Sequence, residues 1–332
     1  MNSRIKTVRQ VLVLILLVAF CILLSSCGKK QKVYRVGIIG GVKPFIGISD
    51  GFRSKMSELG YIDGKNIIYD VQVANLGRQE QSKILNNFLA EKVDLIFAFP
   101  TEPALEAKQV FKGTNIPVVF AIAGIEQNNL IDSVRNPGGN ITGVRYPGPD
   151  LVVKRFEILL ELAPHIKRLL IPYNPDYPIC LPSLQALRPV ASNRGVTLVE
   201  KQIRSLEEIE AAFKGIHKND NIDAIQILPE LLTQSPDVWK VISEFAKENK
   251  LPLVGSMLSS ADNGGVFSYC VDFFEVGKLA APIADKILKG TSAGTISVVS
   301  PEAHLRINYK TAKELNLNIP EGLLSRADEI IR

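Results

Sequence analysis

Val93-Asp-Leu-Ile-Phe-Ala-Phe99 is an almost wholly apolar run that ends directly before a proline. A strand that is buried on both faces of a parallel sheet has this composition, whereas a strand with one solvated face alternates apolar and polar residues. Helical spacing of apolar residues precedes the run at 78–90 and follows it at 102–111. The run therefore predicts a central strand of a parallel sheet that helices cover on both faces.

The same alternation of strand and helix patterns extends from residue 33 to residue 331, with one interruption at Asn136-Pro-Gly-Gly-Asn140. Proline fixes φ and glycine frees it, so this cluster predicts a turn that redirects the chain. The alternation predicts βαβ units and an α/β fold with two halves of similar size. The expected strands are 33–39, 66–73, 93–99, 117–122, 168–172, 196–201, 223–228, 251–254, 265–269, 295–299 and 304–308, and the expected helices are 46–59, 78–90, 102–111, 149–162, 181–194, 205–217, 235–249, 272–288, 309–314 and 321–331.

The N-terminal residues 1–26 have the composition of a secretory signal peptide. Three cations and no acid precede an apolar stretch of about 14 residues, which is shorter than the roughly 20 that a spanning helix needs. Leu24-Ser-Ser-Cys27 then resembles a bacterial lipobox, and this resemblance implies cleavage before Cys27 and lipidation of that residue. An uncleaved anchor, or an ordinary signal with a chance cysteine, is the alternative. Residues 27–32 would form a short polar tether.

The remaining composition is that of an ordinary globular protein. The full chain carries 39 Lys and Arg against 34 Asp and Glu, and removal of the three cations in residues 1–26 leaves a net charge near +2. Basic runs with interleaved aromatic residues are absent from the sequence, so nucleic acid is not an expected partner. Cys180 and Cys270 would remain after export and lipidation, either paired in a disulfide or as two buried free thiols.

Several short motifs together are similar to one family. They are Lys32-Val-Tyr-Arg-Val-Gly-Ile-Ile39, Glu58-Leu-Gly-Tyr-Ile-Asp-Gly-Lys-Asn66, Asn136-Pro-Gly-Gly-Asn-Ile-Thr-Gly143, Tyr173-Asn-Pro175, Lys286-Ile-Leu-Lys-Gly290, Ile307-Asn-Tyr-Lys-Thr-Ala-Lys313 and Leu324-Ser-Arg-Ala-Asp-Glu-Ile330. In this order they resemble the ABC-transporter substrate-binding lipoproteins that include the tryptophan/tyrosine-type binding proteins.

This resemblance implies a periplasmic-binding-protein type I fold, with two doubly wound lobes joined by three crossing segments. We expect the crossings near 141–144, 265–267 and 290–294. The N-terminal lobe would then comprise 33–143 plus 267–291, and the C-terminal lobe 144–266 plus 292–332. A hinge motion about the crossings would open and close the space between the lobes.

Ligands of doubly wound sheets bind beyond the carboxyl ends of the strands, so the loops at those ends hold the candidate binding residues. Thr101 opens a helix whose free N–H groups could hold an anion, or it could simply cap that helix. Lys43 could neutralise an anion, and Tyr177 and Tyr269 could stack on a flat ligand. The full set is Gly41, Lys43, Pro44, Pro100, Thr101, Glu102, Ala123, Asn174, Tyr177, Pro178, Glu230, Met257, Tyr269 and Asp272.

The expected ligand is a small molecule of a restricted kind. The residues that correspond to the amino-group site of the aromatic-amino-acid binders read Leu231, Leu232 and Met257, and burying an ammonium against them would be costly. We therefore expect an apolar or aromatic acid rather than tryptophan or tyrosine.

The sequence shows no coherent catalytic set, metal-ligand spacing or dinucleotide fingerprint, so we expect neither an enzyme nor a cofactor or metal. The expected function is capture of a solute outside the cytoplasmic membrane, on a lipid anchor, and its delivery to an ABC permease. The alternative is a solute sensor that signals to a membrane receptor.

Overall fold

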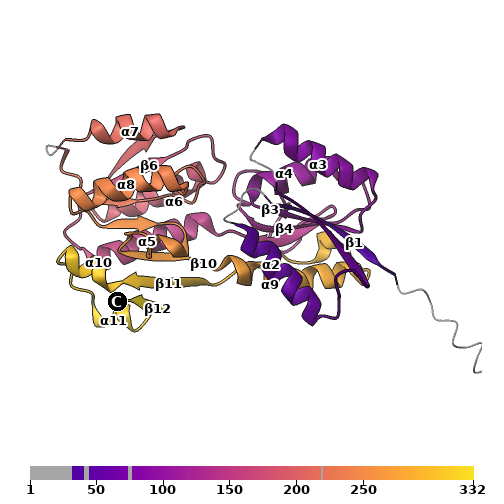
Figure 1. The fold of residues 1–332 in the computed structure, drawn as a ribbon. Coiled ribbons are helices and arrows are strands. Elements are labelled where there is room, and N and C mark those ends of the chain that lie inside the picture. The colour runs from indigo at the N-terminus through magenta and orange to yellow at the C-terminus, as the bar shows by residue number, and fades with distance from the viewer. Residues whose placement is uncertain (1–31, 41–44, 74–76, 218–219) are drawn as a thin grey trace, which may run out of the picture.

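Two α/β lobes lie side by side in the computed structural model, which describes residues 32–40, 45–73, 77–217 and 220–332 (Figure 1). Each lobe is built on its own twisted sheet, and helices cover both faces of each sheet. The expected doubly wound, two-lobed fold is therefore confirmed. The predictions for the signal peptide, Cys27, the tether up to residue 31, Gly41, Lys43 and Pro44 lie outside the described residues.

The N-terminal lobe contains a five-stranded parallel sheet in the order β2-β1-β3-β4-β5. The central strand β3 is the apolar run that predicted the fold, and all five of its residues are buried. Alternate side chains pack against different helices: Phe97 lies in the core with α2 and α9, and Ile96 in the core with α3 and α4. The elements are β1 (Tyr34–Gly40), α2 (Ile46–Glu58), β2 (Ile67–Val73), α3 (Arg78–Ala90), β3 (Leu95–Phe99), α4 (Thr101–Val110), β4 (Val118–Ala123), β5 (Ile141–Arg145) and α9 (Phe273–Leu288).

The C-terminal lobe contains a seven-stranded sheet in the order β12-β11-β10-β9-β8-β6-β7, in which β10 and β11 form the antiparallel pair. One core lies under α5, α6 and the C-terminal segment, and a second lies under α7 and α8 on the other face. The elements are α5 (Gly148–Leu162), β6 (Arg168–Tyr173), α6 (Cys180–Asn193), β7 (Thr197–Gln202), α7 (Leu206–Lys214), β8 (Ala224–Gln226), α8 (Pro236–Glu248), β9 (Leu253–Gly255), η3 (Leu258–Ser260), β10 (Phe267–Val271), β11 (Ala303–Asn308), α10 (Tyr309–Glu314), α11 (Glu321–Leu324) and β12 (Glu329–Ile331).

The chain crosses between the lobes three times, at residues 146–147, at Asp272 and at residues 300–302. Each crossing lies later than expected, so 267–271 belongs to the C-terminal sheet and 292–299 lies against β5 of the N-terminal lobe. Two glycines within the expected crossing segments lie in close backbone contacts. A Cβ on Gly143 would lie 2.0 Å from the carbonyl oxygen of Phe120, and one on Gly294 would lie 2.4 Å from that of Gly139.

Three other local predictions differ from the structure. The stretch 321–331 was expected to be one helix, but α11 ends at Leu324 and β12 then pairs with β11. The stretch 295–299 was expected to be a strand; a 3-10 turn, η4 (Ala293–Thr295), comes first, and only Val299 makes a bridge, to Val144. Strand β5 had been taken for a crossing. All three segments are short, and tertiary pairing outweighs local propensity in such segments.

Helices α2 and α9 lie side by side on the N-terminal sheet although more than 200 residues separate them in sequence (Figure 1). Two glycines allow their backbones to approach closely. A Cβ on Gly277 would lie 2.0 Å from the carbonyl oxygen of Ile48, and a Cβ on Gly51 would lie 1.9 Å from that of Phe274. Any larger side chain at either position would push the two helices apart.

We therefore expect Gly277→Ala to lower the free energy of unfolding by roughly 1–3 kcal/mol, the usual cost of overpacking, because a backbone atom cannot rotate aside. Urea denaturation measures this change. Gly322→Ala is the matched control, since Gly322 also lies in a helix but a Cβ there would meet open space. Equal stability of Gly277→Ala and the wild type would contradict the close-approach argument.

Candidate functional site

A cavity lies between the two lobes, at the carboxyl ends of strands from both sheets. Its volume is about 40 Å³. Doubly wound sheets place their ligand sites at this edge, so the cavity is the candidate site. The lining residues are Phe45, Pro100, Thr101, Ile122, Tyr146, Tyr177, Ile179, Pro229, Glu230, Leu231, Gln234, Ser256, Met257 and Phe273.

The N-terminal wall of the cavity is built around the start of α4. Thr101 is only 3% exposed, and its hydroxyl accepts a hydrogen bond of 3.0 Å from the N–H of Gly124, just beyond β4. The helix begins at Thr101 and its N-cap is Pro100, without a side-chain cap. Thr101 therefore ties α4 to the end of β4 rather than capping its helix, and the first N–H groups of α4 have no partner from a preceding turn.

The C-terminal wall of the cavity is formed by the loops after β8 and β9. The carboxylate of Glu230 is 2% exposed and accepts hydrogen bonds from the N–H groups of Leu232 at 2.6 Å and Thr233 at 2.9 Å. The amide of Gln234 donates to the hydroxyl of Ser256 at 2.5 Å, which joins the two loops. These bonds fix the position of an acidic group in an otherwise largely apolar wall.

Two carboxyl groups from opposite lobes flank Tyr177. Burial raises the pKa of Glu102 and that of Glu230, and interaction with the Tyr177 hydroxyl partly offsets this rise for Glu102. The pKa of Tyr177 lies well above its ordinary value because desolvation disfavours its charged form and because the negative charges of Glu102 and Glu230 add to this effect. Within the described residues, Oε2 of Glu102 is buried without a hydrogen-bond partner.

Arg155 of α5 is fully buried at the hinge side of the cavity. Its Nε–H donates to the carbonyl oxygen of Tyr269 at 2.8 Å, and Nη2 donates to the hydroxyl of Tyr146 at 3.2 Å and to the carbonyl oxygen of Ser256 at 3.3 Å. Tyr146 lies in the first crossing, Tyr269 lies just before the second, and Ser256 lines the cavity. One guanidinium thus links two hinge segments to a cavity loop.

The structure brings part of the predicted set together. Pro100, Thr101, Tyr177, Glu230 and Met257 line the cavity, and Glu102 lies against Tyr177. The other described members serve the surrounding structure. Ala123 is buried as the last residue of β4, and the side chain of Asn174 accepts a hydrogen bond from the N–H of Asp176 in a turn that leads to Pro178. The backbone carbonyl of Tyr269 accepts a hydrogen bond from Arg155. Asp272 caps α9, because its carboxylate accepts hydrogen bonds from the N–H groups of Phe274 and Glu275.

Sequence reasoning missed other lining residues for identifiable reasons. Tyr146 follows β5, a strand that the pattern did not predict. Phe273 directly follows Asp272, and Leu231 directly follows Glu230. Both therefore lie beside residues of the predicted set. Ile179 extends from the start of α6 across the cleft, where its side chain would meet a Cβ on Gly124 or Gly148. The other lining residues outside the predicted set are Phe45, Ile122 and Gln234, together with Pro229 and Ser256, which lie in loops that the carboxyl-end rule indicated.

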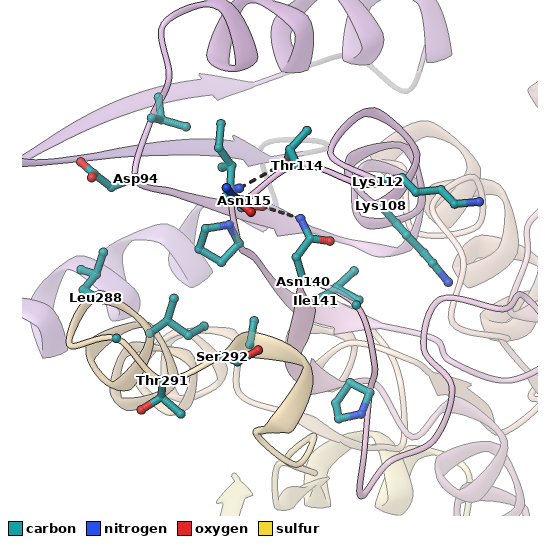
Figure 2. A pocket seen from close by; sticks show the side chains of 18 of the residues that line it. Asp94, Lys108, Lys112, Thr114, Asn115, Asn140, Ile141, Leu288, Thr291 and Ser292 are labelled. Carbon is teal, nitrogen blue, oxygen red and sulfur yellow. Dashed lines mark hydrogen bonds between the residues drawn. The ribbon is translucent and has the colours of Figure 1, made fainter.

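A second and larger cavity, of about 940 Å³, opens at the other end of the N-terminal sheet (Figure 2). Its lining comes from the segments before β3, β4 and β5 and from the turn after α9. Some of its polar side chains have partners: Lys32 pairs with Asp94 at 2.6 Å, and the amide of Asn140 donates to two backbone carbonyls, those of Phe111 and Ile116. Because it lies at the amino ends of the strands rather than at their carboxyl ends, it is a weaker candidate than the interlobe cavity.

Other site types find little support in the described ranges. These ranges contain no group of His, Cys, Asp and Glu that could hold a metal ion, and no helix with the length and apolarity needed to cross a bilayer. Cys180 and Cys270 are buried free thiols, so the disulfide alternative does not hold. Burial raises the pKa of the Cys180 thiol, which keeps it protonated and therefore a poor nucleophile.

Comparison with known proteins relates nearly the whole described chain to one protein family. Residues 44–331 match the family model of the ABC transporter substrate binding protein. A tyrosine-binding protein of Clostridioides difficile is 29% identical over 270 residues, which cover 80% of this chain and 76% of that protein.

Two solved structures superpose on most of the chain. A ligand-free, open substrate-binding protein with adhesive properties from Clostridium difficile has a TM-score of 0.71 at 25% identity, covering 90% of this chain and 99% of the other. An ABC domain from Streptococcus pneumoniae in complex with L-Trp has a TM-score of 0.80 at 22% identity, covering 90% and 100%, and shows the shared fold. The chain belongs to the family of ABC transporter substrate-binding proteins.

Proposed function

We propose that this protein captures a small aromatic solute between its lobes, outside the cytoplasmic membrane, and delivers it to an ABC importer while a lipid on Cys27 anchors it. The observation that carries the proposal is the interlobe cavity, to which both sheets contribute the carboxyl ends of their strands. The family membership of the chain supports the transport role. Neither step requires a bond to be made or broken.

The lining of the cavity supports an aromatic ligand. Phe45, Tyr146, Tyr177 and Phe273 contribute rings to a wall that also contains Ile122, and aromatic faces bind flat ligands by stacking or edge contacts. The tyrosine and tryptophan named for two similar proteins make aromatic amino acids the first candidates. This candidate class differs from the apolar or aromatic acid that the sequence analysis favoured.

Entry of such a ligand requires motion of the lobes. The cavity volume of about 40 Å³ is far below the roughly 300–1,000 Å³ that ligand pockets usually occupy. Three short crossings join the lobes, and rotation about them can open the cavity without disturbing either sheet. The protein therefore works as a clamp whose hinge lies at residues 146–147, 272 and 300–302.

Ligand capture predicts a rise in melting temperature, because a ligand that binds only the native state stabilises it by mass action. At a free concentration of about 100 times Kd the gain is about 2.7 kcal/mol, which scanning calorimetry resolves readily. L-tyrosine, L-tryptophan and L-phenylalanine form the first panel, with ribose as a control that lacks an aromatic ring. If no compound in a broad metabolite panel raises the melting temperature, the capture role is contradicted.

Hinge closure predicts that a stabilising ligand also reduces the radius of gyration, since it holds both lobes at once. Small-angle X-ray scattering with and without that ligand measures the change. The control is a solute from the same panel that leaves the melting temperature unchanged. A ligand that raises the melting temperature but leaves the scattering profile unaltered would contradict closure while leaving capture intact.

Lipid anchoring predicts that Cys27→Ser abolishes fatty-acid labelling and releases the protein from membranes, because the acyl chains hold the anchor in the bilayer. Metabolic labelling and membrane fractionation of bacterial cells measure both effects. Cys180→Ser is the matched control, since that thiol is buried in the fold and cannot carry a lipid. Continued labelling of Cys27→Ser would contradict the lipoprotein assignment.

A further inference from the structure

We propose that the amino edge of the N-terminal sheet is a docking surface for a bilayer that contains anionic phospholipids, and that the cavity of about 940 Å³ at this edge receives a lipid headgroup. The proposal rests on the proposed lipid anchor and adds to it a surface that fixes how the anchored protein lies on the membrane. The amino edge consists of the segments that lead into β1 to β5, which are 32–33, 59–66, 91–94, 111–117 and 132–140.

An exposed cation precedes every strand of the N-terminal sheet. The five are Lys65 before β2, Lys32 before β1, Lys92 before β3, Lys112 before β4 and Arg135 before β5. Because the strands lie in the order β2-β1-β3-β4-β5 and neighbouring strands are about 4.8 Å apart, these residues follow one edge over roughly 19 Å. Positive charge along a whole sheet edge fits an extended anionic surface such as a bilayer.

The charges of the amino edge are unevenly balanced. Three ion pairs neutralise most of its acids: Lys32 with Asp94 at 2.6 Å, Arg35 with Glu91 at 2.9 Å and Arg53 with Asp63 at 3.0 Å. The other four cations of the row have no acidic partner among the described residues, and Asp132 is the one acid of the edge there without a cation. Helices α2, α3 and α4 end at this edge, and their carboxyl ends stabilise nearby cations, so the fold tolerates the excess.

The cavity at the amino edge has the size and the lining to receive a headgroup (Figure 2). Its volume of about 940 Å³ lies within the range of roughly 300–1,000 Å³ that ligand pockets usually occupy. Lys112 lies on one side of it, and Thr291 and Ser292 lie on the opposite side, in the turn after α9. An ammonium and two hydroxyl groups can donate hydrogen bonds to the oxygens of a phosphate diester and of glycerol.

The position of Cys27 in the sequence brings the same edge to the membrane. Lys32 lies at the amino edge only five residues after Cys27, a stretch that spans at most about 18 Å when fully extended. The C-terminal lobe lies at the opposite end of the N-terminal lobe, beyond the carboxyl ends of the strands (Figure 1). A lipid on Cys27 therefore keeps the amino edge close to the bilayer and leaves the interlobe cavity farther away.

Single-molecule fluorescence energy transfer from the anchored protein to the bilayer measures docking. The lipidated protein is placed in lipid discs of phosphatidylcholine, or of phosphatidylcholine and phosphatidylglycerol in equal amounts, with an acceptor dye on a lipid headgroup. Gln109→Cys carries the donor dye, because Gln109 is exposed in α4 near the amino edge whereas Cys180 and Cys270 are buried. We expect high transfer only with phosphatidylglycerol, and its loss at about 1 M NaCl, where the Debye length is roughly 3 Å.

Charge reversal at the amino edge tests the cations themselves. The triple variant comprises Lys65→Glu, Lys92→Glu and Lys112→Glu. It should lower the ratio of docked to undocked molecules at least about 100-fold, since each cation near an anionic surface contributes a factor of roughly five.

The matched control makes the same change of charge at the amino ends of the C-terminal sheet. It comprises Lys167→Glu before β6, Arg194→Glu before β7 and Lys250→Glu before β9, all of them exposed. This control should dock as the wild type does. Melting curves of both triple variants show whether they fold, and the salt dependence of the wild type tests the charges without any substitution.

The outcomes distinguish the docking surface from the anchor on which it rests. Equal transfer in discs with and without phosphatidylglycerol would overturn the docking surface and leave the lipid anchor standing. Equal loss of docking in the control variant would overturn the assignment to the amino edge. A protein that associates with neither kind of disc would overturn the anchor and the docking surface together.

Discussion

The close contact of α2 with α9 is the interaction on which the two-lobed arrangement depends. Helix α9 follows β10, the strand that completes the parallel part of the C-terminal sheet, yet it packs on the N-terminal sheet beside α2. The absence of side chains at Gly51 and Gly277 allows this contact, and the chain must cross at Asp272 to reach it. A third crossing then returns the chain to β11. Because α9 belongs to the N-terminal lobe, three connecting segments join the lobes rather than one.

The hinge of three segments explains why an arginine, Arg155, is buried at this position rather than an apolar residue. Arg155 makes hydrogen bonds to Tyr146 in the first crossing and to Tyr269 just before the second, and so holds two of the three connections in register. Its bond to the carbonyl of Ser256 extends this link to the wall of the cavity. A single planar side chain with five donors suits this task, because it can bind groups from several directions at fixed angles.

The sequence predicted the regular part of the fold well and its connections less well. The apolar run at 93–99 and the helix at 78–90 emerge almost as expected, because their burial depends on local composition and spacing. The lobe boundaries differ from the expected ones, because pairing with strands distant in sequence assigns β5, β10 and Val299 to their lobes. In the site, the rule of carboxyl ends located Thr101, Tyr177 and Glu230. It could not find Arg155, whose position depends on long-range packing of α5 against β10.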